Sequence, residues 1–152
     1  MAVDIAGLER RARDLLAPGA YDYFACGAGQ ERTLQASVRA WRRYWLAPRV
    51  LRDVSSVDTG VLLPGRPPAR LRTPVAVAPT AFQGLAHPDG EVATARGAAA
   101  AGALMVLSTR TTRPIEEVAA AVAGAGGAWW FQVYVMGDRD LTARLVNRAV
   151  AA

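Results

Sequence analysis

Lysine is absent from this chain of 152 residues, so all 18 of its cationic side chains are arginines. Histidine and cysteine each occur once, as His87 and Cys26. A single cysteine excludes an internal disulfide and fits a reducing cytoplasm, and we expect Cys26 to be a small buried side chain. The sequence has no zinc-type spacing of cysteine and histidine, and we predict no metal site.

No apolar run is long enough to suggest a membrane span. The charge-free stretch over residues 97–107, around a predicted strand, is well short of the ~18 apolar residues that such a span needs. Residues 1–17 mix arginine and acidic residues with leucine and lack the continuous apolar core of a signal peptide. The sequence therefore predicts a cytoplasmic protein without a membrane partner.

The formal net charge of +5 makes nucleic-acid binding worth weighing. The most basic stretch, residues 39–52, interleaves its arginines with aromatic residues. Arg39 and Arg43 lie four apart, as do Trp41 and Trp45, which predicts a helix with one solvated and one buried face. Because no recognition motif, zinc spacing or repeat accompanies this stretch, we interpret it as a solvated helix face and predict no nucleic-acid partner.

Residues 1–47 predict a helical cap. An amphipathic helix can begin after Asp4 as its N-cap and end at Pro18-Gly19. A short helical segment follows at residues 21–25, and a longer helix is expected over residues 31–45. Three helices in sequence therefore precede the rest of the fold.

Residues 48–73 are irregular in pattern. Turn residues separate two short extended pieces at residues 60–63 and 69–72. We predict a hairpin that closes the base of a sheet.

Three short apolar runs dominate the remaining residues, 74–152. They cover residues 75–78, 104–107 and 129–134, and alanine-rich helical stretches separate them. This alternation predicts an α/β fold in which a parallel sheet is built from βαβ units. Ligands bind at the carboxyl ends of such strands, so four polar residues are expected on one rim: Thr80, Ser108, Gln132 and Tyr134.

Only about three strand-helix units can be counted, whereas a closed eight-unit barrel needs ~250 residues. The last helix, capped by Asp138, should be followed by a fourth strand. We therefore expect the chain to represent the first part of a truncated barrel, with an unpaired edge and an uncovered apolar wall.

Five segments carry a family resemblance through their order and spacing. They are Tyr21–Ala28, Pro48–Val54, Ala78–Ala81, His87–Glu91 and Phe131–Tyr134. Together they resemble the FMN-dependent 2-hydroxy-acid oxidases and dehydrogenases, the group of glycolate oxidase, lactate oxidase and mandelate dehydrogenase, over nearly the whole chain. The resemblance implies a partial (β/α)8 TIM barrel with an N-terminal helical extension, FMN bound at the carboxyl rim, and oxidation of an L-2-hydroxy acid to the 2-oxo acid.

The resemblance also implies cofactor contacts. The turn Pro79-Thr80-Ala81 would lie against the flavin, where small residues let the backbone approach a flat ring. Ser108 and Gln132 would hydrogen-bond the pyrimidine edge of FMN. Without the resemblance, the residues indicate an ordinary strand-to-helix turn, a helix cap at Ser108 and a hydrogen-bonded polar residue within a sheet at Gln132.

For the substrate, the resemblance implies that Tyr134 donates to the hydroxyl oxygen and that Tyr23 binds the carboxylate. Both tyrosines could otherwise be core aromatics whose hydroxyls reach the surface. Arg110 stands where several members of the family carry an aromatic residue that lines the substrate pocket. Its guanidinium can pair with a substrate carboxylate or point to solvent, and the sequence leaves both alternatives open.

The catalytic histidine, arginine and lysine of the family come from later strands. His87 does not match the base, and we expect it to order its own turn by a hydrogen bond. The chain alone is therefore expected to be inactive, and either aggregation-prone or paired with a complementary half. A complete enzyme would be a homo-oligomer. The alternative hypothesis is a non-catalytic half-barrel remnant or interaction module.

Overall fold

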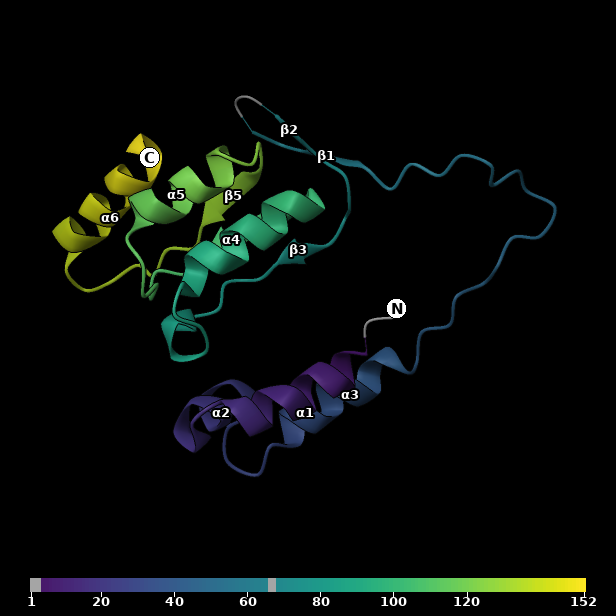
Figure 1. Ribbon diagram of the computed structural model, residues 1–152, viewed down its shortest axis with the longest axis horizontal. Coiled ribbons are helices and arrows are strands. Elements are labelled where there is room, and N and C mark those ends of the chain that lie inside the picture. Colours follow the sequence, from purple (N-terminus) through teal and green to yellow (C-terminus); the bar gives the residue numbers. More distant parts are fainter. Residues whose placement is uncertain (1–3, 66–67) are drawn as a thin grey trace. The chain divides into compact units, whose positions relative to one another are not determined.

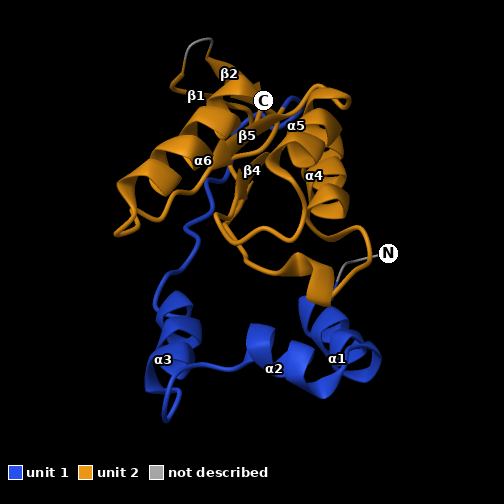
Figure 2. Ribbon diagram, turned by 90° about the vertical axis from the view of Figure 1, so that its left-hand side faces the viewer, with its two compact units in different colours: residues 1–56 blue, residues 57–152 orange. Residues whose placement is uncertain are grey.

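A computed structural model describes residues 4–65 and 68–152. The chain divides into two units, Met1–Ser56 and Val57–Ala152, which are coloured separately in Figure 2. The first unit is helical, and the second contains all the strands (Figure 1). None of the helices in the described ranges is long and apolar enough to cross a membrane.

The first unit contains the three predicted helices with different bounds. They are α1 (Ile5–Leu15), α2 (Pro18–Ala25) and α3 (Arg32–Trp41). Pro18 starts α2 rather than ending α1, because proline lacks the N–H that the first helical position does not need. Asp4 precedes α1 without capping it through its side chain, which instead lies 3.0 Å from the Arg10 guanidinium.

Two predictions for the first unit are wrong. The predicted buried face of the Arg39–Trp45 stretch does not exist: Trp41 is 78% exposed and Trp45 is 90% exposed. The reason is that α3 ends at Trp41. Trp45 therefore lies outside the helix, and the four-residue spacing does not put the two tryptophans on one helix face. Cys26 is also exposed rather than buried, since it follows the last turn of α2.

The second unit begins with the predicted hairpin. Strands β1 (Val61–Leu63) and β2 (Ala69–Leu71) pair antiparallel, with Val61 opposite Leu71. The connection between them includes residues 66–67, which lie outside the described residues. The backbone N–H of Arg72 donates to the Gly102 carbonyl at 2.9 Å, which links the hairpin to the segment that enters the main sheet.

The main sheet is parallel, as predicted. Its strands β3 (Ala76–Val77), β4 (Leu104–Leu107) and β5 (Ala128–Phe131) lie in the order β3-β4-β5. Leu104 pairs with Ala76 on one side and with Ala128 on the other. All three strands therefore end toward the same rim.

Helices connect and cover these strands. They are α4 (Gly90–Ala101), α5 (Ile115–Ala123) and α6 (Arg139–Ala151), with the short 3₁₀ helix η1 (Gln83–Leu85) before α4. The buried face of α4 carries alanines, and these pack against α5 and β4. A Cβ on Gly127 would lie 2.6 Å from the Ala99 Cβ. Small side chains thus allow a close approach of helix and sheet.

The last helix is attached to α5 by an exposed ion pair. Asp138 caps α6 as predicted, because its carboxylate accepts from the Leu141 N–H at 2.9 Å. The guanidinium of Arg148 donates to both carboxylate oxygens of Glu116, each at 2.9 Å. Hydrogen bonding from Arg148, the largest influence, lowers the pKa of Glu116 to about 2.

The stabilising effect of this ion pair is expected to disappear in acid. Because the folded-state pKa of Glu116 lies below its ordinary value of 4.5, its contribution is complete above that value and is lost as the pH falls toward 2. Urea unfolding of the wild type and of Glu116→Gln should differ at pH 7 and converge near pH 2. The pair is exposed, so 1 M salt should also reduce the difference at pH 7. A pH-independent difference would contradict the assignment.

Candidate functional site at the carboxyl rim

The residues after β4 and β5 lie side by side at the rim. The Gln132 N–H donates to the Leu107 carbonyl at 2.8 Å, which extends the parallel pairing one residue beyond β5. Ser108 is buried, and its Oγ lies 3.5 Å from the Gln132 Oε1. The same Oε1 accepts from the Thr109 N–H at 3.3 Å. Two of the predicted site residues, Ser108 and Gln132, are therefore brought together.

These contacts leave one strong donor available. The Gln132 side chain uses its Oε1 within the protein, whereas its Nε2 has no hydrogen-bond partner among residues 4–65 and 68–152. The Ser108 Oγ accepts from the Arg110 N–H at 3.1 Å. Ser108 thus orders the loop after β4, and Gln132 presents an amide N–H₂ that a ligand carbonyl can accept from.

Arg110 and Tyr134 form a pair on the same rim. The guanidinium carbon of Arg110 lies 5.9 Å from the centre of the Tyr134 ring, within range of a cation–π contact. The Tyr134 N–H donates to the Thr109 Oγ1 at 3.1 Å, which fixes the backbone beneath the ring. Tyr134 is 53% exposed, so it is not a core aromatic. Arg110 has no ion-pair partner within the part of the chain described.

The turn after β3 is hydrogen-bonded to the loop after β4. The Phe82 N–H donates to the Arg110 carbonyl at 3.1 Å, and the Gln83 Nε2 donates to the Thr80 carbonyl at 3.1 Å. Pro79 and Thr80 are exposed. The predicted turn Pro79-Thr80-Ala81 thus leads into a segment that is fixed to the neighbouring rim loop.

Two further residues from the sequence-based predictions lie elsewhere. Tyr23 belongs to α2 in the other unit, where its ring contacts Phe24 edge-on at 5.1 Å, and its substrate role stays a prediction. His87 precedes α4, and its Nδ1 accepts from the Asp89 N–H at 3.0 Å. The expected ordering of this turn by a histidine hydrogen bond is confirmed.

Sequence reasoning missed Glu91, which it named only as the end of the His87–Glu91 segment. The residue is fully buried, and its carboxylate accepts from the Gln83 N–H and the Thr112 N–H and hydroxyl. Burial, the largest single influence, raises the pKa of Glu91, but these hydrogen bonds together lower it below its usual value. A signal did exist, because Glu91, Ala95 and Ala98 share the buried face of α4 at helical spacing.

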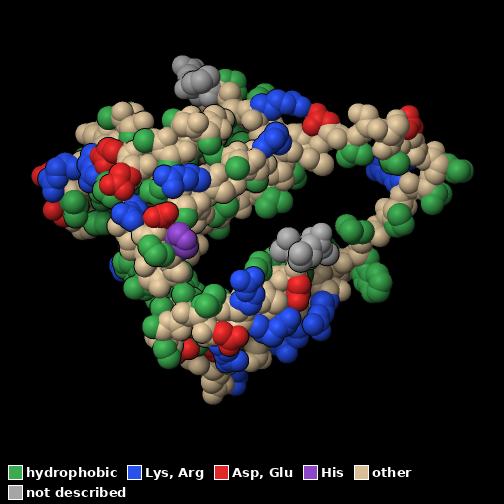
Figure 3. Space-filling model, viewed as in Figure 1, with side chains coloured by type: hydrophobic (Ala, Val, Ile, Leu, Met, Phe, Trp, Pro, Cys, Tyr) green, Lys and Arg blue, Asp and Glu red, His purple; other side chains and the backbone are tan. Residues whose placement is uncertain are grey.

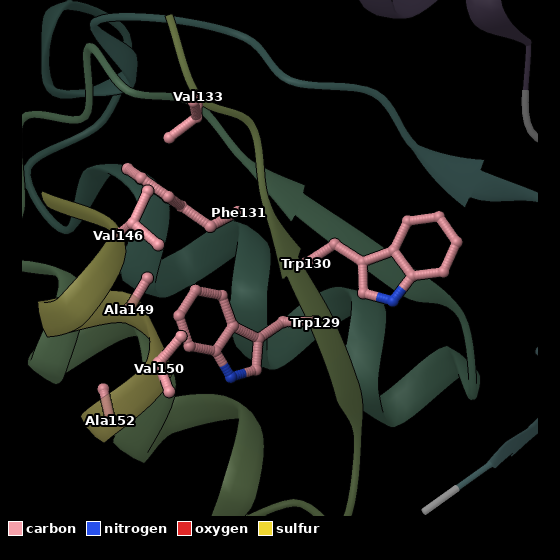
Figure 4. Close-up of a pocket in the computed structure, with 8 residues that line it drawn as sticks. All are labelled: Trp129, Trp130, Phe131, Val133, Val146, Ala149, Val150 and Ala152. Carbon is pink, nitrogen blue, oxygen red and sulfur yellow. The ribbon is translucent and has the colours of Figure 1, made fainter. Parts of the chain in front are cut away.

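An apolar groove runs along β5 and α6. Its volume is about 670 Å³. In Figure 4, Trp129 and Phe131 extend from β5 toward α6, whereas Trp130 points away from the other labelled side chains. One edge of β5 pairs with β4, and no strand in the described ranges pairs with its other edge. The lining residues are Trp129, Trp130, Phe131, Val133, Val146, Ala149, Val150 and Ala152.

Charged side chains of both signs lie on the face drawn in Figure 3. Among the described residues, no group of three or more His, Cys, Asp or Glu side chains is arranged to hold a metal ion.

Known proteins resemble this chain over nearly all of its length. The FMN-dependent dehydrogenase family matches residues 12–152. An L-lactate oxidase of Nostoc sp. is 44% identical over 151 residues, covering 99% of this chain and 40% of the relative. Glycolate oxidase 1 of Zea mays is 46% identical over 141 residues, covering 93% of this chain and 37% of the relative.

Solved structures of mandelate oxidase are also similar to this chain. A mandelate oxidase with (S)-4-hydroxymandelic acid has a TM-score of 0.89 at 40% identity, covering 99% of this chain and 40% of that chain. A mandelate oxidase variant with a C4a-OH-FMN adduct has a TM-score of 0.85 at 40% identity, covering 95% of this chain and 42% of that chain. This chain thus spans about 40% of the length of the relatives it matches and corresponds to their N-terminal portion. It belongs to the FMN-dependent dehydrogenase family.

Proposed function

We propose that this chain contributes the first part of an FMN-dependent (β/α)8 barrel that oxidises an L-2-hydroxy acid to the 2-oxo acid. The observation that carries the proposal is the pair Ser108 and Gln132 at the carboxyl rim of a parallel sheet, with the Gln132 Nε2 free to donate. Parallel α/β folds bind ligands at this rim. A cytoplasmic location is part of the same proposal.

The donor set of the rim fits the pyrimidine edge of a flavin. That edge carries carbonyl oxygens, and the Gln132 Nε2 can donate to one of them while its Oε1 stays bound to the loop after β4. Gln132 and the loop ordered by Ser108 would hold this edge, while Pro79-Thr80-Ala81 would face the ring. Bound FMN would supply the two-electron acceptor for the oxidation.

Two tyrosines are proposed to hold the substrate. Tyr134, exposed on the rim, would donate its phenolic O–H to the substrate hydroxyl oxygen, and Tyr23 would bind the carboxylate. Oxidation removes a hydroxyl proton together with a hydride equivalent from the alcohol carbon, and a general base must receive that proton. The only histidine of this chain is His87, whose Nδ1 is engaged in its own turn, so we assign the base to another part of the assembled enzyme.

The simplest test is to titrate FMN with the whole chain, alone and mixed with the remaining portion of a family relative. Quenching of flavin fluorescence should saturate with the mixture, and the mixture should oxidise glycolate, lactate or mandelate. Oxidation is read from the 2-oxo acid formed. Absence of both binding and oxidation in a mixture that forms a stable complex would refute the proposal.

The groove along β5 and α6 favours one alternative, an interaction module without catalysis. Such a module would bind the complementary portion through this groove and leave flavin fluorescence unchanged. The same titration therefore separates the two functions, because complex formation without FMN binding supports the module and rejects the enzyme.

Arg110 offers a prediction about substrate choice in the assembled enzyme. Its guanidinium lies at the rim without an ion-pair partner in the described residues, beside Tyr134. We expect Arg110→Ala to reduce kcat/KM about tenfold for 2-hydroxy acids with a second carboxylate, because a charged hydrogen bond is worth ~1.5–3 kcal/mol, and to change it less than twofold for neutral side chains. Equal losses for both substrate classes would remove the charge-pairing role.

A further inference from the structure

Glu91 is a fully buried carboxylate that has no cationic partner among the residues described. Its Oε1 accepts from the Gln83 N–H at 3.1 Å and from the Thr112 N–H at 3.0 Å. Its Oε2 accepts from the Thr112 hydroxyl at 2.6 Å. Hydrogen bonds to a charged acceptor are about twice as strong as neutral ones. One carboxylate on α4 therefore binds the segment after β3 and the loop after β4 simultaneously.

The segment after β3 and the loop after β4 lie so close together that a side chain at Gly84 would collide with Thr112. The Gly84 N–H donates to the Thr112 Oγ1 at 3.0 Å. A Cβ on Gly84 would lie 2.8 Å from the same Oγ1, and a Cβ on Gly90 would lie 3.2 Å from the Gly84 nitrogen. Gly90 also has a φ of +49°, which favours glycine. The contact around Thr112 is thus tightly packed as well as hydrogen-bonded.

Hydrogen bonds lead from this contact to the rim. The side chain of Gln83 donates to the Thr80 carbonyl and accepts from the Thr94 hydroxyl at 2.6 Å. The neighbouring Phe82 adopts a φ of +57°, a left-handed conformation that is costly for a bulky residue, and its N–H donates to the Arg110 carbonyl. The segment after β3 thus needs external bonds to keep this shape.

We infer that Glu91 is a positioning residue: its buried carboxylate fixes the Pro79–Ala81 turn relative to the Ser108–Arg110 loop. The inference deepens the proposed function, on which it rests for the identity of the ligand that the two segments face. Glu91 does not touch that ligand. It acts through Gln83 and Thr112, whose groups all donate to the one Glu91 carboxylate.

Hydrogen exchange of the whole chain, read by mass spectrometry, tests the contact without any ligand. In Glu91→Gln one carboxylate oxygen becomes an N–H₂ group, so the Thr112 hydroxyl loses its acceptor. We expect amides of residues 80–84 and 110–113 to exchange about tenfold faster. Peptides from α6 should be unchanged, and Asp140→Asn, which neutralises an exposed carboxylate, should leave every peptide unchanged. No change, or uniform acceleration along the chain, would overturn the inference.

FMN affinity, measured with the chain mixed with the remaining portion of a relative, separates positioning from stability. Glu91→Gln should raise the dissociation constant about tenfold. Val122→Ala, which removes buried methyl groups in the last turn of α5, at the end of the helix opposite the rim loop, should lower the melting temperature and leave the dissociation constant within twofold. Equal FMN affinity in the wild type and Glu91→Gln would overturn the positioning role. If the wild type binds no FMN, the proposed function fails, and the exchange experiment alone decides whether Glu91 fixes the two segments.

Discussion

Met105→Ala is expected to lower the free energy of unfolding by about 2–5 kcal/mol, the range typical of large-to-small changes in a core. Met105 is fully buried in β4, the central strand of the parallel sheet. It belongs to a core formed with residues of α4 and α5, including Ala95 and Val118. Removing its side chain leaves a cavity between the sheet and both helices, which only partial relaxation can fill.

Urea denaturation followed by circular dichroism measures this effect. Leu62→Ala provides the control, since Leu62 is 66% exposed in the hairpin and its truncation should change the free energy by less than about 0.5 kcal/mol. Because small domains are stable by only about 5–15 kcal/mol, the Met105 variant should be largely unfolded at moderate urea concentrations. Similar effects of the two substitutions would mean that β4 is not central to the core.

Gln132→Leu is expected to weaken FMN binding by 10- to 100-fold in the assembled enzyme. The substitution removes the Nε2 donor that the proposed function directs at the flavin. It also removes the Oε1 acceptor of the Thr109 N–H and the Ser108 hydroxyl. Each unpaired polar group left in a site costs roughly 1–3 kcal/mol, which corresponds to this range of dissociation constants.

The measurement is a fluorescence titration of FMN, with the melting temperature recorded for each variant. Gln35→Leu is the matched control, because it makes the same change on the exposed surface of α3, and it should leave the FMN affinity unchanged. Retained FMN affinity in a folded Gln132→Leu variant would remove Gln132 from the cofactor site.

The parallel sheet could be predicted from the sequence because the patterns that indicate its strands and helices are local. Short apolar runs bounded by turns and separated by helical stretches leave few other arrangements. The same reasoning placed Ser108 and Gln132 at equivalent strand ends, and their hydrogen-bond distance follows from the pairing of β4 with β5. The roles of these residues with FMN still depend on the family resemblance, because strand position alone does not specify a ligand.

Other features depend on contacts between distant segments. The burial of Glu91 arises only when Thr112, 21 residues later, supplies its donors. The predicted helix over residues 31–45 relied on the helical spacing of apolar residues up to Trp45. That spacing is the same whether or not the backbone continues as a helix, and α3 ends at Trp41. Local patterns therefore predicted which elements form, whereas side-chain partners and helix ends required the folded chain.

The adjacent tryptophans of β5 give its uncovered edge an intrinsic optical signal. Trp129 packs partly against the core, whereas Trp130 is 47% exposed on the other side of the strand. An indole transferred from water to an apolar contact emits at shorter wavelength. A strand added beside β5 would therefore shift the emission of Trp130 to the blue. The pairing of such a strand with β5 can thus be followed in real time without an attached dye.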